Sequence, residues 1–277
     1  MIERKIKKLV QAQTMSEGNG ATVHRSIGLR HLMDIDPFLL LDEMDIPDSA
    51  VNVGFPDHPH RGFETVTYML SGHMQHKDKS GNAGDIGPGD VQWMTAGRGI
   101  IHSEMPITGG AHLRGFQLWV NLPAEKKMIA PRYQDITKDR IPTIEGDTYT
   151  ATLIAGSLNG TTGPVSEIAI APLYMDVTLT ENGEATLPIP LGHTAVIYGI
   201  DSEFTINNTL VPSRTLAILT DGNNVTISGE AGTRFLLIAG APIREPIARY
   251  GPFVMNTREE IMQTLDDWNK GVFHNAS

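Results

Sequence analysis

Cysteine is absent from all 277 residues of the sequence. Disulfide bonds, thiolate metal sites and cysteine nucleophiles are therefore excluded, and any metal has to be bound by imidazole and carboxylate groups. Such donors suit Fe(II), Mn(II), Ni(II), Cu(II) or Zn(II). A cytoplasmic location is the default expectation, although the absence of cysteine alone does not establish a compartment.

Long apolar segments and a surplus of basic residues are missing as well. No apolar run reaches the roughly 18 residues of a membrane-spanning helix. The basic N-terminus, Met1 to Leu9, is not followed by the apolar core of a secretory signal, so no signal peptide is expected. The formal net charge of −10 argues against direct nucleic acid binding, because no excess of Lys and Arg exists to neutralise phosphates.

Short apolar segments separated by glycine, proline and Asn/Asp turns make up most of the chain. This pattern is typical of an all-β protein, and the scarcity of helical periodicity favours sandwiches or barrels over an α/β sheet. The segments that read most clearly as strands are Thr65 to Leu70, Phe116 to Asn121, Thr150 to Ala155, Ala195 to Ile200 and Arg234 to Ala239.

A proline- and charge-rich segment, Pro123 to Glu145, separates two β-rich halves. Each half is long enough to bury its own core. We therefore predict two domains, residues 1–135 and residues 136–277, with the boundary inside this segment.

One helix is predicted, near the C-terminus. Thr257 and Glu260 have the spacing of a capping box, and Ile261, Leu265 and Trp268 recur at helical spacing. The apolar stripe is interpreted as a face that packs on the β-structure, in preference to a surface for a partner.

Two pairs of metal-ligand residue types occur at i, i+2 spacing: His58 with His60, and His102 with Glu104. Residues two apart on a strand point to the same face. Two such strands facing each other across a barrel would supply three imidazoles and one carboxylate, which leaves positions for water or substrate on a divalent metal. A lone His-x-His pair is often only a polar feature near a turn, but the second pair favours the metal site.

The other histidines are weaker candidates. His73 and His76 differ in strand parity, so at most one of them faces the site; His76 could lie at the cavity rim, but a solvated strand is the favoured interpretation. Five isolated histidines are expected at the surface or as satisfied core residues: His24, His31, His112, His193 and His274. The C-terminal half has no His-x-His or His-x-Glu pair, so it is predicted to lack a metal.

Four longer segments resemble the pirin family of bicupins. They are Phe55 to Leu70 (FPDHPHRGFETVTYML), Pro88 to Pro106 (PGDVQWMTAGRGIIHSEMP), Phe116 to Pro123, and Arg244 to Ile261 (REPIARYGPFVMNTREEI). The resemblance spans nearly the whole chain. It implies two cupin barrels (double-stranded β-helix or jelly-roll) packed face to face, with one metal ion in the N-terminal barrel only.

The resemblance also implies a ligand set. By motif position the ligands are His58, His60, His102 and Glu104. Many other cupins instead use a carboxylate four residues after the second histidine, which here is Glu64, and strand parity also allows Glu64 to face inward. The pirin resemblance favours Glu104 as the ligand and leaves Glu64 as an orienting residue or a spectator, while either carboxylate could serve as the catalytic base.

Two functions of different class follow from the resemblance. The first is a quercetin 2,3-dioxygenase, in which one divalent metal, most readily Fe(II) but also Ni, Mn, Co, Cu or Zn, binds a flavonol that reacts with O2 and releases carbon monoxide. The alternative is a metal-dependent regulatory protein that binds transcription factors or metabolic enzymes without physiological turnover. Another cupin reaction, such as sugar isomerisation, is more distant. A monomer is expected.

Overall fold

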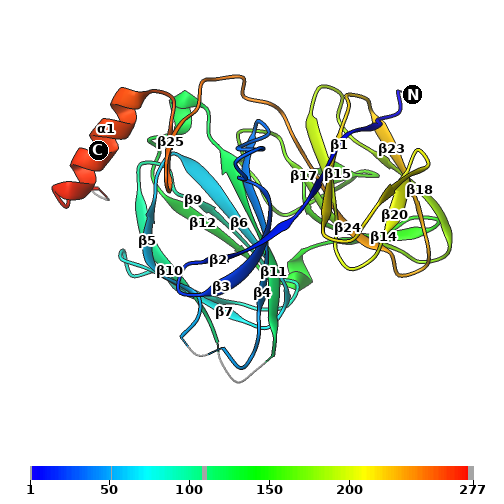
Figure 1. Ribbon diagram of the computed structural model, residues 1–277, viewed down its shortest axis with the longest axis horizontal. Helices are drawn as coiled ribbons and strands as arrows, with labels where there is room; N and C mark the ends of the chain where they lie inside the picture. The colour runs from blue at the N-terminus through cyan, green and yellow to red at the C-terminus, as the bar shows by residue number, and fades with distance from the viewer. Residues whose placement is uncertain (1, 51, 108–110, 274–277) are drawn as a thin grey trace. The chain divides into compact units, whose positions relative to one another are not determined.

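The computed structural model describes residues 2–50, 52–107 and 111–273. The chain is almost entirely β-structure and divides into two compact units (Figure 1). The first unit contains residues 13–138 and 243–277, and the second contains residues 1–12 and 139–242. The all-β fold predicted from the sequence is confirmed, and all five predicted strands coincide with observed strands.

The first unit contains the two histidine pairs. Its strands are β2 (Gln13–Glu17), β3 (Ala21–Ile27), β4 (Phe38–Ile46), β5 (Phe55–His60), β6 (Phe63–Ser71), β7 (Met74–Asp78), β8 (Ala83–Ile86), β9 (Val91–Thr95), β10 (Ile100–Pro106), β11 (Leu113–Asn121), β12 (Arg132–Ile136), β25 (Ala248–Tyr250) and β26 (Phe253–Met255). A seven-stranded sheet has the order β12-β9-β6-β11-β4-β3-β2, and a four-stranded sheet has the order β5-β10-β7-β8. Neighbouring strands in both sheets are antiparallel, as in a jelly roll.

The second unit repeats this plan. Its strands are β1 (Ile6–Gln11), β13 (Thr143–Glu145), β14 (Tyr149–Ala155), β15 (Ser157–Leu158), β16 (Thr161–Thr162), β17 (Leu173–Leu179), β18 (Gly183–Pro188), β19 (Thr194–Gly199), β20 (Phe204–Ile206), β21 (Thr209–Val211), β22 (Thr215–Leu219), β23 (Asn224–Gly229) and β24 (Arg234–Gly240). A seven-stranded sheet has the order β1-β22-β19-β24-β17-β14-β13, a four-stranded sheet has the order β18-β23-β20-β21, and β15 pairs with β16. Alternate residues of these strands, such as Leu153, Met175 and Ile197, are fully buried and fill the interior with apolar side chains.

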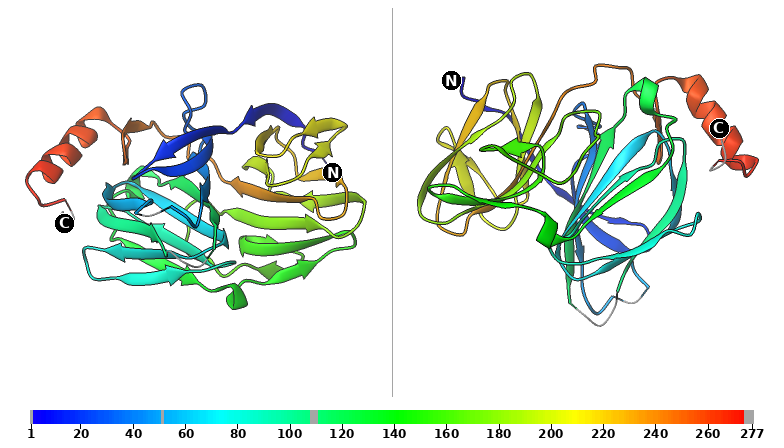
Figure 2. Two further views of the ribbon diagram at one scale, coloured as in Figure 1. Left: turned by 60° about the horizontal axis from the view of Figure 1, so that its bottom comes forward. Right: turned by 180° about the vertical axis from the view of Figure 1, so that it is seen from behind.

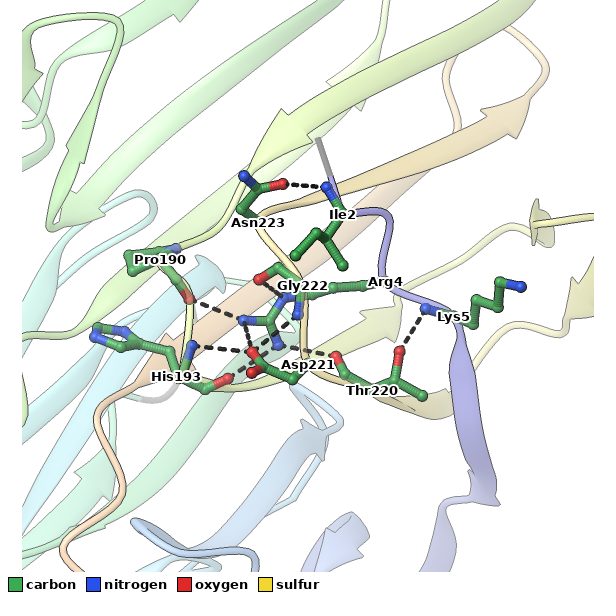
Figure 3. A network of polar contacts seen from close by, with 10 residues as sticks. Ile2, Arg4, Lys5, Pro190, His193, Thr220, Asp221, Gly222 and Asn223 are labelled. Carbon is green, nitrogen blue, oxygen red and sulfur yellow. Dashed lines mark hydrogen bonds and ion pairs between the residues drawn. The ribbon is translucent and has the colours of Figure 1, made fainter.

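The N-terminal residues belong to the second unit because Arg4 is buried in it (Figure 3). Arg4 is 1% exposed. Its guanidinium donates to four backbone carbonyl groups, those of Gly222 (3.0 Å), His193 (2.9 Å), Thr220 (3.1 Å) and Pro190 (2.8 Å). Strand β1 then pairs with β22. The units therefore differ from a division into residues 1–135 and 136–277. Residues 1–12 belong to the unit that contains residues 139–242, and residues 243–277 belong to the unit that contains residues 13–138.

The C-terminal end joins the first unit through β25, β26 and helix α1 (Arg258–Asn269), which lies at the edge of that unit in both views of Figure 2. The predicted capping box is present: the backbone N–H of Glu260 donates to the Thr257 hydroxyl (3.2 Å), and the Glu260 carboxylate accepts from the Thr257 N–H (2.9 Å). Ile261 packs against Phe253, as the predicted packing face requires, whereas Trp268 is 39% exposed. No helix in the described ranges is long and apolar enough to span a membrane.

Candidate metal site

The two histidine pairs lie on neighbouring strands of one sheet. Strands β5 and β10 are antiparallel, and their register places His102 opposite His58 and Ile100 opposite His60. The expectation that the two strands face each other across a barrel is therefore wrong. The i, i+2 parity still holds on each strand, and adjacent strands bring side chains of one face closer together than opposed sheets do.

Three imidazole rings converge at this point. One ring nitrogen from each of His58, His60 and His102 can be chosen so that all lie within 4.8 Å of one another. The Nε2 atoms of His58 and His60 are 3.0 Å apart. His60 and His102 are 2% and 1% exposed. His58 is half-buried. Three nitrogen donors at this separation, two of them on buried rings, have the arrangement that a single divalent transition metal requires.

Hydrogen bonds at the far side of two rings determine which nitrogen faces the cluster. The Nδ1–H of His58 donates to the carbonyl of Pro56 (2.8 Å), so its Nε2 carries the free lone pair. The Nδ1 of His102 is 3.3 Å from the Nδ1 of His76. The buried Nε2 of His102 has no hydrogen-bond partner among the described residues. A metal ion would satisfy it, so the donor set fits a metal.

Burial also keeps these rings uncharged. Desolvation, and then the neighbouring His58, hold the pKa of His60 well below its usual value. Desolvation, and then the nearby His60 and His58, do the same to the pKa of His102. Both rings are therefore neutral near pH 7, the form in which imidazole binds a metal.

Glu104 lies on the same strand as His102 but is separated from it by a break in the register between β10 and β5. Its carboxylate is 1% exposed and accepts hydrogen bonds from Gln117 Nε2 (2.8 and 3.1 Å) and Thr67 Oγ1 (3.1 Å). It is not a member of the group of three ligand atoms described above. As a fourth ligand Glu104 stays a proposal, in which Gln117 and Thr67 orient the carboxylate.

Glu64 occupies a different place from the one that parity suggested. Strand β5 ends at His60, and Gly62, with φ of +87°, turns the chain before β6 begins, so the alternation does not continue from His60 to Glu64. A Cβ at Gly62 would collide with the carbonyl oxygen of Val254. Glu64 therefore projects from the face of β6 opposite to Thr67, which bonds Glu104.

The Glu64 carboxylate is held by other groups. It accepts hydrogen bonds from Trp93 Nε1 (3.0 Å) and Thr95 Oγ1 (2.6 Å). Burial raises the pKa of Glu64, and these two bonds partly offset that rise. A carboxyl in this position can support the sheet but does not face the imidazole cluster.

Replacing Glu64 with glutamine is expected to leave metal content and turnover within about threefold of wild type. The amide keeps the shape of the carboxyl but accepts fewer hydrogen bonds, so the cost falls on stability, by about 1–2 kcal/mol. Metal analysis, steady-state kinetics and thermal denaturation check this. Loss of turnover with metal retained would instead make Glu64 the catalytic base.

His76 is a site residue that the sequence did not identify. A solvated strand was the favoured interpretation, but His76 is 2% exposed, and its ring contacts Tyr133 at 4.7 Å between ring centres as well as His102. The parity argument is confirmed, because His73 is exposed. His76 lies opposite Glu104 on the antiparallel pair β7–β10, and this position comes from strand register, which sequence spacing does not specify.

Four other histidines of the described residues do not belong to the cluster. His24 is buried and, like the exposed His112, contacts Asp45; His31 is exposed and His193 is half-buried. His274 lies outside the described residues.

A cavity of about 460 Å³ opens beside His58 and His60. This volume is within the range of small-molecule sites. Its wall combines apolar side chains with polar and charged ones: Leu40, Phe55, Pro56 and Trp119 with Glu17, Arg25, Asp42, Asp57, Gln117 and Arg249. Two of the three imidazoles, those of His58 and His60, therefore face a cavity of a size that holds small molecules.

A buried lysine ties the β5–β6 connection to the C-terminal segment. Lys127 is 1% exposed, and its ammonium donates to the carbonyl of Gly62 (2.8 Å), Asn121 Oδ1 (2.7 Å) and the carbonyl of Val254 (3.1 Å). Burial lowers the pKa of Lys127 to about 8.

This pKa predicts a rise of stability with pH. Between the folded value of about 8 and the unfolded value of roughly 10.4, the unfolded chain binds more protons, so unfolding becomes less favourable as pH increases. The free-energy difference between wild type and Lys127→Met should shift in favour of wild type by about 2 kcal/mol from pH 7.5 to 9.5. Urea denaturation at both pH values measures it; a pH-independent difference would show that the three acceptors keep the ammonium charged.

Known proteins resemble this chain along nearly its whole length. The family model "Pirin" matches residues 19–120, and the model "Pirin C-terminal cupin domain" matches residues 174–274. A pirin-like protein of Solanum lycopersicum is 45% identical over 97% of this chain and 92% of its own length, and human pirin is 44% identical over 96% and 92%.

A solved structure gives the same result for the fold. The crystal structure of a quercetin 2,3-dioxygenase from Acinetobacter baumannii superposes with a TM-score of 0.90 at 36% identity and covers 98% of both chains. The two units are thus cupin domains, as the sequence resemblance implied. On its sequence and its fold, this chain belongs to the pirin family.

Proposed function

We propose that this protein is a metal-dependent dioxygenase that opens the heterocycle of flavonols such as quercetin with O2 and releases carbon monoxide. The observation that carries the proposal is the convergence of three imidazoles, two of which line a cavity large enough for an aromatic substrate. The similarity to the A. baumannii quercetin 2,3-dioxygenase supports the choice of reaction.

In this proposal the Nε2 atoms of His58, His60 and His102 hold one metal ion, with Glu104 as the fourth ligand. A bound divalent metal, with Fe(II) as the first candidate and Ni, Mn, Co, Cu or Zn as alternatives, would polarise the flavonol oxygens and make the ring more reactive toward O2. His76 orients His102 through the contact between their Nδ1 atoms.

The other residues of the site bind the substrate and handle its proton. Phe55 and Trp119 supply flat apolar surfaces for a planar molecule and keep water from its rings. A carboxylate is needed to accept the proton of the 3-hydroxyl group, and Glu104 is the candidate, since Glu64 lies on the other face of β6. Gln117 and Thr67 would hold its oxygens at a fixed position before the transfer.

The proposal is tested by loading the protein anaerobically with each of Fe, Mn, Ni, Co and Cu and then adding quercetin and O2. Loss of the flavonol absorbance together with one equivalent of carbon monoxide is the expected result for at least one metal, and a His58→Ala variant should give neither. Tight metal binding without turnover across all five metals would overturn the dioxygenase and favour a regulatory role for the site.

A further inference from the structure

The C-terminal segment contributes a cation to the cavity wall. Arg249, on β25, belongs to the motif RYGPF, and Gly251 and Pro252 of the same motif also line the cavity. The guanidinium carbon of Arg249 lies 5.0 Å from the centre of the Trp119 ring, and that ring lies 5.1 Å from the ring of His60. One aromatic side chain therefore separates this cation from the imidazole cluster.

Two backbone carbonyls hold the guanidinium in place. Arg249 donates from Nη1 to Leu39 (3.1 Å) and from Nε to Gly251 (3.3 Å). Its Nη2 makes no hydrogen bond within the described ranges. Asp34 and Asp42 attract the guanidinium electrostatically, but neither forms a hydrogen bond or a close ion pair with it in that part of the chain. Stacking on an indole further restricts its motion, so the unused N–H groups have a fixed direction.

The second arginine of the cavity, Arg25, is paired with carboxylates. Arg25 donates to both oxygens of Asp42 (2.8 and 2.7 Å) and lies 2.8 Å from a carboxylate oxygen of Glu17. Its positive charge is therefore offset by two carboxylates. Of the two arginines that line the cavity, Arg249 is the one with capacity left for an anion.

We propose that Arg249 determines substrate specificity by binding an acidic group, a phenolate or a carboxylate, on the part of a planar aromatic substrate that is remote from its metal-binding oxygens. The inference rests on the proposed function, in that it assumes an aromatic molecule at the imidazole cluster. A guanidinium that is partly desolvated and fixed by stacking binds such a group by charge-assisted hydrogen bonds, which are about twice as strong as neutral ones. The substrate class is thus an aromatic anion with a chelating group at one end and an acidic group at the other.

The test uses fluorescent flavonols that differ only in this acidic group. Metal-loaded wild type, Arg249→Met and Arg249→Lys are titrated under anaerobic conditions with 3-hydroxyflavone and with its 4′-carboxy and 7-carboxy derivatives. Wild type should prefer one carboxylate isomer over the parent. Arg249→Met should bind that isomer roughly 10- to 100-fold more weakly and the parent within about threefold. Arg249→Lys should keep part of the preference, and added salt should reduce it.

The outcomes separate this inference from the proposed function. Equal loss of affinity for parent and carboxylate in Arg249→Met, or no preference in wild type, overturns the role of Arg249 even if flavonol turnover is observed. A carboxylate preference that depends on Arg249, in a protein that turns over none of the three flavonols, supports the binding role and overturns only the dioxygenase. Failure of wild type to bind any of the three overturns both.

Discussion

His102→Ala is expected to reduce bound metal from one ion per chain to a trace and to abolish flavonol turnover, while the fold is retained. The variant removes one of three imidazoles and leaves His76 facing a space instead of the ring that it orients. Loss of a partner that only orients a ligand lowers metal affinity roughly 10- to 100-fold. Loss of the ligand itself should exceed that. Elemental analysis of protein purified without added metal, followed by isothermal titration, measures both quantities.

Two further variants serve as comparisons, at His76 on β7 and at His73, which directly precedes that strand. His76→Ala should weaken metal binding roughly 10- to 100-fold without abolishing it. His73→Ala should change nothing, because His73 is exposed and its parity directs it away from the cluster. The assignment of the site would be contradicted if His102→Ala kept full metal content, or if His73→Ala lost as much metal as His102→Ala.

The histidine cluster could be predicted because it depends only on residue spacing within two short segments. His58 with His60, and the position of His102, require only that the two segments are strands, and parity then specifies the faces. The parity argument failed for Glu64, because the turn at Gly62 interrupts the strand and restarts the alternation on β6. Turn geometry of this kind depends on the carbonyl of Val254, which is distant in the sequence.

Site residues that come from segments distant in the sequence from both histidine pairs were not predicted. His76 is placed by the β7–β10 register, and Gln117 reaches Glu104 from β11. Arg249 enters the cavity wall only because residues 243–277 join the first unit. The fold class followed from turn spacing and strand length, whereas the exchange of chain ends between units has no local signal. The motif that contains Arg249 was visible in the sequence, but its place in the fold was not.

Arg61→Met is expected to lower the stability of the first unit by about 2–5 kcal/mol, because the hydrogen-bond acceptors of a buried guanidinium lose their donor, at about 1–3 kcal/mol for each one left unpaired. Arg61 is 1% exposed and follows His60 directly. Its guanidinium contacts Asp267 of helix α1 (2.6 Å) and donates to the carbonyls of Arg98 (2.5 Å) and Phe273 (2.9 Å). Methionine fills much of the same volume but leaves these acceptors without a partner.

All three tryptophans of the chain, Trp93, Trp119 and Trp268, belong to the first unit, so tryptophan fluorescence during urea denaturation reports on this unit specifically. The matched control is Lys270→Met, which removes the exposed pair of Lys270 and Asp266 on the same helix (64% and 48% exposed). That change should cost no more than about 0.5 kcal/mol.

The two variants compare a buried guanidinium with an exposed ammonium. They also test whether contacts with helix α1 affect the metal site. Arg61 adjoins a metal-ligand candidate on one side and Gly62, whose carbonyl accepts from Lys127, on the other. If the guanidinium fixes the end of β5, Arg61→Met should weaken metal binding as well as folding, whereas Lys270→Met should change neither. A stability loss equal to that of Lys270→Met, with metal affinity unchanged, would show that α1 is held by its apolar face alone. Weakened metal binding in Arg61→Met but not in Lys270→Met would mean that the buried guanidinium, which joins β5 to Asp267 of the helix 206 residues away, helps to hold His60 in position.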